Sequence, residues 1–458
     1  MPAMEPYRIK MVEPIPFPTP AERRQAFVRA GYNAFNLPAD VVTIDLLSDS
    51  GTGATSSRQD AAAVLSDASY AGRSSWFAFR DAVRDLTGYP HILPVHQGRA
   101  AERILFSALL GPGKISISNT HFDTTRFNVA ATGATALDLP CPESADMDSA
   151  YPFKGNIDLD TLATTLAGPD GPKVAFVLMT VTNNGGGGQP VSMANLRATR
   201  DLCHRNQVPL FLDAARFAEN AWLVTQREPG YQHRTPKEVA SLAFSMSDGC
   251  TASLKKDGIT AEGAFIGLRD PKLARQCEIQ LIGTEGHLTY GGLGGHDLAR
   301  LAQGLREVVD PRYLRARADH TAHLARLVND AGVAMVQPPG IHALYLNAAR
   351  LLPHLPPSQF PGHALACQLY LEGGIRCSEV GSLYLGSIDD NFDLTIPAPF
   401  ELVRLAIPRR VYTQSHLEYV AGVIAEIAKA PERVPGYRIL DADPFLRPFT
   451  VVMAPLAV

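Results

Sequence analysis

The sequence lacks the features of a membrane-spanning or nucleic-acid-binding protein. Its 458 residues contain no apolar run near the roughly 18 residues that a membrane span requires. The formal net charge of −4 provides no excess of basic residues for nucleic acid or an acidic membrane surface. We therefore expect no nucleic-acid partner and no membrane partner. The length suits one large domain with a smaller one.

Cysteine is scarce as well, and its spacing excludes common uses. The six cysteines form no Cys-x-x-Cys pair and no spacing typical of metal ligands. We expect free thiols in a reducing compartment and no metal site. The first twenty residues, "MPAMEPYRIKMVEPIPFPTP", lack the apolar core of a secretory signal. We interpret them as a proline-rich arm of a cytoplasmic protein.

The middle of the chain alternates short apolar runs with helical patterns. Strands are predicted at 91–95, 173–181 and 208–215, and Ser192 caps a predicted helix. This alternation predicts a parallel sheet with helices on both faces and ligands at the carboxyl ends of its strands. From about Glu307 the pattern changes to long amphipathic helices with few strands.

We therefore predict three parts of the chain. They are an N-terminal arm (1–20), a small domain (21–55 and 307–458) and a large ligand-binding domain (56–306).

The segment "HQGRA" follows a predicted strand and opens a predicted helix. Gln97, Gly98 and Arg99 would present backbone N–H groups and a guanidinium to an anion at the helix N-terminus. An ordinary strand-to-helix turn explains the segment equally well.

A carboxylate stands near the end of the strand predicted at 208–215. Asp213 ends the apolar run "LFLD", and Arg216 follows three residues later. A carboxylate in that position needs a partner. It could pair with Arg216 or cap a helix. Alternatively, it could keep a pyridine nitrogen protonated, as pyridoxal phosphate chemistry requires.

The stretch "SMSDGCTASLKKDG" (245–258) is small and polar and then presents two adjacent lysines. We expect a loop whose backbone approaches a ligand. Lys255 beside Lys256 would favour the neutral amine that a Schiff-base lysine needs. Without context, two surface lysines would be the better interpretation. The order of anion-binding segment, Asp213 and Ser253-x-Lys-Lys favours a cofactor site instead.

An arginine interrupts the apolar strand pattern near the C-terminus. Arg404 stands in "VRLAIPRRVYT", and a buried arginine normally has an anionic partner. We predict that it clamps a substrate α-carboxylate in a bidentate contact. Arg409 and Arg410 are expected to be solvated.

Motifs along nearly the whole chain resemble the β-eliminating lyases of the tryptophanase and tyrosine phenol-lyase group. The matching segments include "AGYNAF", "DLLSDSGT", "SYAG", "HQGRAAE", "GGQPVSMAN", "DAARFAEN", "DGCTASLKKD", "TYGGLGG" and "RLAIPRRVYT". The resemblance implies an α/β aspartate-aminotransferase-like fold (fold type I) with a mixed, mostly parallel sheet and a smaller α+β domain. It also implies pyridoxal 5′-phosphate and a homotetramer built as a dimer of dimers.

The resemblance assigns roles to individual residues. Lys256 is implied to be the Schiff-base lysine and base, and Lys255 its electrostatic helper. Tyr70, from a neighbouring subunit, is implied to assist departure of the leaving group, with Asp123. The implied cofactor-binding residues are Gln97, Gly98, Arg99, Phe122, Asn184, Asp213, Arg216, Ser253 and Lys256. The implied substrate-binding residues are Ser50, Arg404, Val380, His287, Phe35 and Pro448.

Departures from the family pattern concern the substrate and a metal ion. Val380 and Asp123 follow the tryptophanase pattern rather than that of the phenol-lyases. Pro448 replaces a histidine of tryptophanases, and His287 replaces a large apolar residue. His287 could be structural or could touch substrate.

The monovalent-cation site of the family also departs. Ala68 stands where the family has a glutamate, and Ala261 stands where it has an asparagine. Losing the charged ligand puts potassium dependence in doubt.

The sequence therefore predicts β-elimination from a tryptophan- or tyrosine-like L-amino acid to give pyruvate, ammonia and the leaving group. The alternative is a biosynthetic enzyme that performs β-replacement, or C–C or C–S bond cleavage, on an unusual amino acid. A catalytically silent binding protein is a third hypothesis. Retention of Lys256, Asp213, Arg404 and Tyr70 together disfavours it.

Overall fold

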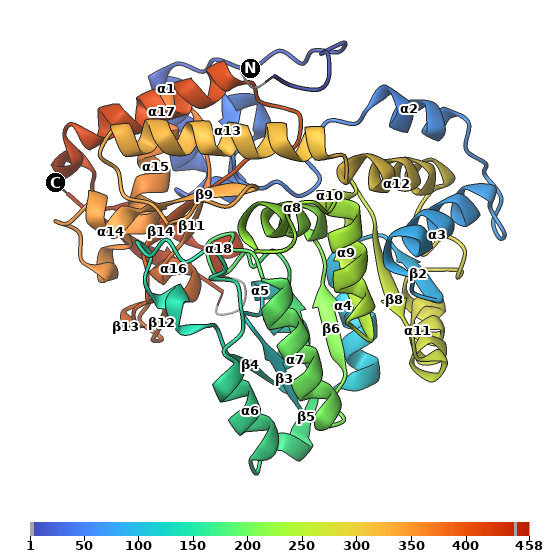
Figure 1. Ribbon diagram of the computed structural model, residues 1–458. Helices are drawn as coiled ribbons and strands as arrows, with labels where there is room; N and C mark the ends of the chain where they lie inside the picture. The colour runs from blue at the N-terminus through green and yellow to red at the C-terminus, as the bar shows by residue number, and fades with distance from the viewer. Residues whose placement is uncertain (1–3, 444–446, 458) are drawn as a thin grey trace. The chain divides into compact units, whose positions relative to one another are not determined.

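The computed structural model describes residues 4–443 and 447–457. The chain divides into two compact units, one formed by Met1–Asp49 with Arg317–Val458 and the other by Ser50–Ala316 (Figure 1). Compactness alone does not test whether a segment folds as a domain, so the predicted domain boundaries stay a prediction. Within the described ranges, no helix has the length and apolar character needed to cross a membrane.

The unit Ser50–Ala316 is built on a seven-stranded sheet of order β2-β8-β7-β6-β5-β3-β4. Its strands are β2 (His91–Val95), β3 (Ile115–Ser118), β4 (Thr135–Asp138), β5 (Val174–Thr180), β6 (Leu210–Asp213), β7 (Gly249–Ser253) and β8 (Ala264–Leu268). Neighbouring strands from β4 to β7 pair in parallel, and β8 runs antiparallel to β7 and β2. The apolar runs predicted as strands are β2, β5 and β6. The sheet is mixed and mostly parallel, as predicted.

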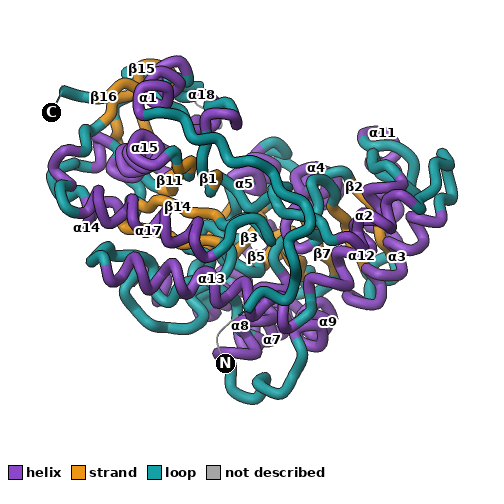
Figure 2. Tube along the Cα trace, turned by 90° about the horizontal axis from the view of Figure 1, so that it is seen from above, coloured by secondary structure: helices purple, strands orange, loops and turns teal. Residues whose placement is uncertain are grey.

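Helices cover both faces of this sheet. The helices of this unit are α2 (Ser57–Val64), α3 (Ser74–Thr87), α4 (Gly98–Leu109), α5 (Asp123–Ala130), α6 (Leu159–Ala167), α7 (Met193–Arg205), α8 (Phe217–Arg227), α9 (Pro236–Ser245), α10 (Leu254–Asp257), α11 (Pro271–Thr284) and α12 (Gly295–Val308). Figure 2 shows α4 and α5 on one side of the strands and α7, α8 and α9 on the other. Ser192 caps α7 as predicted, because its Oγ accepts the backbone N–H of Asn195 at 3.0 Å.

The stretch 245–258 is not the loop that its composition suggested. Residues Gly249–Ser253 form β7, which pairs in parallel with β6 and antiparallel with β8, and the single turn of α10 follows. Small residues are required here because neighbouring backbone lies close. A Cβ on Gly249 would come within 2.6 Å of the carbonyl oxygen of Gly267. The composition therefore reflects a buried central strand that leads directly into the two lysines.

The other unit contains a three-stranded antiparallel sheet of order β11-β14-β9. These strands are β9 (Ala343–Asn347), β11 (Ser378–Val380) and β14 (Leu402–Ala406). Its shorter strands are β1 (Ile44–Asp45), β10 (Ile375–Arg376), β12 (Ser387–Ile388), β13 (Leu394–Ile396), β15 (Tyr437–Asp441) and β16 (Val452–Pro455). Its helices are α1 (Pro20–Arg29), α14 (Ala348–Leu351), α15 (Pro361–Gly373), α16 (Ser382–Leu385), α17 (Gln414–Ala428) and α18 (Arg447–Thr450). Helix α13 (Pro311–Asp330) begins in the sheet unit and continues into this one.

Arg409 is buried, although we expected it to be solvated. Its side chain is 1% exposed, and its Nη1 lies 2.9 Å from Oδ2 of Asp49, which is 2% exposed. The same nitrogen donates to the backbone carbonyl of Asp49 at 3.2 Å. The expectation was wrong because local sequence does not reveal a carboxylate 360 positions away.

Breaking this buried pair should destabilise the protein strongly. Because the remaining charge stays buried, Asp49→Asn or Arg409→Met should lower the free energy of unfolding by about 3–5 kcal/mol. Urea denaturation measures the change, with Arg433→Met at an exposed site as the matched control. Equal stability of Arg409→Met and Arg433→Met would contradict this reading of the ion pair.

Candidate active site

A cavity lies where several strands of the large sheet end. It is lined by Thr180 at the end of β5, Asp213 at the end of β6 and Ser253 at the end of β7. Gly98, the first residue of α4, completes this group. Carboxyl ends of parallel strands are where α/β proteins place their ligands, so this cavity is the candidate site.

One end of the cavity suits a phosphate group. Helix α4 begins at Gly98, and the first N–H groups of a helix have no partner within it. Gly98 packs tightly against β7, because a Cβ there would lie 2.7 Å from Cβ of Ser253. Gln97, Arg99 and Ser253 line the cavity beside it. Backbone donors, a hydroxyl and a guanidinium together form an anion-binding end.

The two adjacent lysines both line the same cavity. They belong to α10, which follows β7 without a connecting loop. The Nζ of Lys256 donates to Oγ of Ser253 at 3.0 Å. A primary amine is therefore held next to the anion-binding end by a strand buried in the sheet.

The cavity lining also includes the carboxylate of Asp213. Its Oδ1 accepts the backbone N–H of Ala215 at 3.2 Å. Burial raises the pKa of Asp213, and the charges of Lys256 and Arg216 only partly offset that effect. A further cation beside this carboxylate would therefore be stabilising. Pyridoxal phosphate fits the donor set, because it carries a phosphate, an aldehyde for an amine and a ring nitrogen that accepts a proton.

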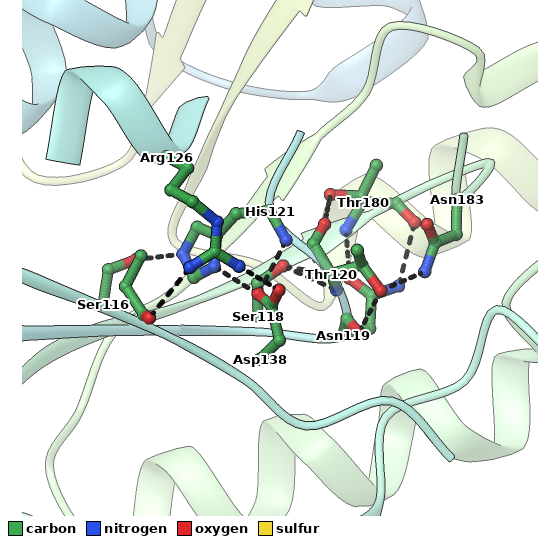
Figure 3. Close-up of polar contacts among 10 residues, drawn as sticks. Ser116, Ser118, Asn119, Thr120, His121, Arg126, Asp138, Thr180 and Asn183 are labelled. Carbon is green, nitrogen blue, oxygen red and sulfur yellow. Dashed lines mark hydrogen bonds and ion pairs between the residues drawn. The ribbon is translucent and has the colours of Figure 1, made fainter. Parts of the chain in front are cut away.

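Phe122 lines the cavity from the loop between β3 and α5. Its neighbour His121 anchors this loop (Figure 3). The backbone N–H and Nδ1 of His121 lie 2.8 and 2.6 Å from Oδ1 of Asp138, and its Nε2 lies 2.8 Å from Oγ of Ser116. Arg126 pairs with the other oxygen of Asp138. Burial alone would raise the pKa of Asp138. The hydrogen bonds and the charges of His121 and Arg126 outweigh burial and hold this pKa below its ordinary value.

A second set of contacts fixes the other end of this loop (Figure 3). The Nδ2 of Asn119 donates to the carbonyl oxygens of Gly155 and Thr180, at 2.6 and 3.1 Å. Its Oδ1 accepts the N–H of Thr180 at 2.9 Å, which ties the end of β3 to the end of β5. Asn183 donates to Oγ1 of Thr120 at 3.2 Å. The loop that carries Phe122 is thus held from both sides.

The cavity brings together all the residues that the sequence assigned to the cofactor. They are Gln97, Gly98, Arg99, Phe122, Asn184, Asp213, Arg216, Ser253 and Lys256, and Ser50 and Lys255 also line the cavity. Three predicted residues of the same unit do not belong to its lining. Asp123 begins α5, where its Oδ1 accepts the N–H of Thr124.

The other two, Tyr70 and His287, lie next to each other. Tyr70 is 71% exposed, and its ring centroid lies 5.9 Å from that of His287 and 5.5 Å from that of Tyr290. The Nδ1 of His287 accepts the backbone N–H of Thr289 at 3.3 Å. In the neutral imidazole this contact places the ring proton on Nε2.

Four predicted substrate residues belong to the other compact unit. Arg404 lies in β14, where its Nη2 donates to the carbonyl oxygen of Leu47 at 3.1 Å, and Val380 lies in the adjacent β11. Phe35 packs against Phe449 with ring centroids 4.6 Å apart. The carbonyl oxygen of Pro448 accepts from Asn33 at 3.1 Å.

Sequence reasoning missed several residues that line the cavity. They are Glu102, Thr120, Thr124, Thr180, Val181, Thr182, Gly185, Ala215 and Thr251. Glu102 could have been found, because it stands one helical turn after Gly98 and therefore shares its helix face. The threonines give no such signal, since Thr124 in α5, Thr180 at the end of β5 and Thr251 within β7 come together only in the assembled fold.

Comparison with known proteins shows which family the chain belongs to. The family model described as "Beta-eliminating lyase" matches residues 45–422. The chain belongs to the β-eliminating lyase family. It is 49% identical over 454 residues to a tryptophanase of Salinibacter ruber, covering 99% of this chain and 96% of the relative. It is 40% identical over 456 residues to a tyrosine phenol-lyase of Symbiobacterium thermophilum, covering 100% and 99%.

The fold comparison agrees with this assignment. The threonine aldolase of Leishmania major superposes with a TM-score of 0.59 at 14% identity, covering 84% of this chain and 99% of that one. The fold is the predicted aspartate-aminotransferase-like fold. This member of the β-eliminating lyases is a pyridoxal-phosphate-dependent carbon–carbon lyase.

The close packing of Gly98 gives a test of the anion-binding end. Gly98→Ala forces α4 away from Ser253, so affinity for pyridoxal phosphate should fall at least about tenfold, as loss of a charge-assisted hydrogen bond does. Titration of apoenzyme with cofactor, followed by absorbance, measures this. Gly111→Ala, at the other end of α4, meets open space and should bind normally. Unchanged affinity in Gly98→Ala would contradict the assignment.

Proposed function

We propose that this lyase cleaves a β-substituted aromatic L-amino acid, with an indole-like leaving group as the first candidate. The products would be pyruvate, ammonia and the aromatic compound. The observation that carries the proposal is the joint presence of Gly98, Lys256 and Asp213 in one cavity. Val380 and Asp123 follow the tryptophanase pattern, and a tryptophanase is 49% identical to this chain.

Each residue of the cavity has its own role in the proposed reaction. When bound, pyridoxal phosphate supplies an electron sink for the bond broken at the substrate Cα. Lys256 holds the amine that attaches the cofactor and then removes the proton from Cα. Lys255 favours the neutral form of that amine, and Asp213 holds the ring nitrogen as a cation. Phe122 orients the ring.

The remaining roles rest on resemblance to the family. Arg404 and Ser50 bind the α-carboxylate of the substrate. Tyr70, contributed by a neighbouring subunit of a homotetramer, donates a proton to the departing β-substituent, with Asp123. The leaving-group pocket is assigned to Phe35, Val380, His287 and Pro448.

The cation requirement of the family is expected to be relaxed in this chain. Ala68 offers no carboxylate where the family has a glutamate, and Ala261 offers only its backbone carbonyl. We therefore propose that K⁺ is not required for activity.

The substrate assignment is tested with purified holoenzyme and a panel of L-tryptophan, L-tyrosine and S-substituted cysteines. We expect equal amounts of indole and pyruvate from tryptophan. Tyr70→Phe should lower kcat for tryptophan by about 10²–10⁴-fold, because a carbon leaving group needs a proton. The loss should be smaller for a cysteine whose thiolate leaves without one. Tyr419→Phe, at another exposed tyrosine, should retain full activity.

Two outcomes would overturn the proposal. The absence of pyruvate from every substrate would exclude β-elimination on these amino acids. A product that carries an added nucleophile, with little pyruvate, would assign the chain to β-replacement instead.

A further inference from the structure

His121 stands directly before Phe122 and has a hydrogen-bond partner at both ring nitrogens. Its side chain is 0% exposed and does not line the cavity. Nδ1 lies 2.6 Å from Oδ1 of Asp138, and Nε2 lies 2.8 Å from Oγ of Ser116 (Figure 3). These contacts join the loop after β3 to the last residue of β4 and to β3 itself. The mechanism above gives this histidine no part.

The order serine, histidine and carboxylate is the one that activates a nucleophilic serine in hydrolases. Ser116, however, lies within β3, is 0% exposed and does not line the cavity. Because no substrate can reach its hydroxyl group, a nucleophilic role is excluded. The contacts of His121 are instead explained by what they hold in place.

The hydroxyl proton of Ser116 fixes the tautomer of His121. A buried hydroxyl group needs an acceptor, and among the described residues Nε2 of His121 is its hydrogen-bond partner. In the neutral ring, Nε2 then accepts and Nδ1 carries the proton. Nδ1 donates to Asp138, whose carboxylate also faces Arg126. The bond to this charged acceptor is the stronger of the two ring contacts.

Asp138 holds the chain on both sides of Phe122. The carbonyl oxygen of Phe122 opens α5, because it accepts the N–H of Arg126 at 2.8 Å. Before Phe122, the backbone N–H of His121 donates to Oδ1 of Asp138 at 2.8 Å. After it, the side chain of Arg126 pairs with the other oxygen of the same carboxylate. Since Phe122 lies between these contacts and lines the cavity, a shift of His121 would move its ring.

We propose that His121 is a positioning residue of the active site, whose hydrogen bond from Nδ1 to Asp138 keeps the ring of Phe122 in place against the cofactor. The inference rests on the proposed role of Phe122 in orienting the cofactor ring. His121 touches neither cofactor nor substrate and acts through Phe122. Its effect on the rate is geometric, because misplacing reacting groups by about 1 Å can cost about 100-fold.

The two ring nitrogens can be replaced separately. An asparagine side chain places its amide nitrogen near the position of Nδ1, whereas a glutamine side chain places it near that of Nε2. His121→Asn therefore keeps a donor for Asp138, and His121→Gln extends towards Ser116 instead. Both side chains are neutral amides, so the two variants are a matched pair. His233→Asn, at an exposed site, is the control.

The first measurement is the circular dichroism of bound pyridoxal phosphate, which depends on how its ring is held. The second is the rate of pyruvate formation from the most active substrate of the panel above. We expect His121→Gln to lose most of the dichroism in the cofactor band and to lower kcat by about 10–100-fold, with KM changed less. His121→Asn, Ser116→Ala and His233→Asn should keep the dichroism and a kcat within about threefold of the wild type.

Equal dichroism and equal kcat in His121→Asn and His121→Gln would overturn the inference. Failure of His121→Gln alone to fold would also overturn it, because the contact would then be structural. Phe122→Leu tests the placement on which the inference rests, and we expect it to bind the cofactor with the dichroism lost. Unchanged dichroism in Phe122→Leu would refute the proposed role of Phe122, and the inference with it. The expected loss in Phe122→Leu beside equal His121 variants would refute the inference alone.

Discussion

The incompletely compensated charge of Asp213 is the constraint on which the site depends. A carboxylate at the end of a central strand is stable only with cations around it, and Lys256 and Arg216 supply part of that compensation. A positively charged group of a ligand beside Asp213 would add to that compensation. In the proposed arrangement, the protonated ring nitrogen of pyridoxal phosphate would be that group.

Rigid elements place the other groups relative to that carboxylate. The amine of Lys256 stands directly after a buried strand, and the anion-binding end begins where Gly98 packs against the same strand. The loop of Phe122 is fastened to β4 through His121 and to β5 through Asn119. Sites supported in this way hold their geometry without the ligand, which lowers the cost of binding.

Much of this could be predicted from sequence, where each signal was local. Apolar runs predicted β2, β5 and β6, and Ser192 predicted the start of α7. The order of Gly98, Asp213 and Lys256 predicted a cofactor site. Interactions between distant segments could not be predicted. The burial of Arg409 depends on its ion pair with Asp49, which is distant in sequence. The composition of β7 is typical of a loop, and only its pairing with β6 and β8 makes it a strand.

The central claim is that Lys256, rather than its neighbour, attaches the cofactor. The most direct test reduces the holoenzyme with borohydride, digests it and locates the modified lysine by mass spectrometry. We predict the pyridoxyl group on Lys256, and no modified peptide from Lys256→Ala. Modification of Lys255 in the wild type, or equal modification of both lysines, would contradict the account.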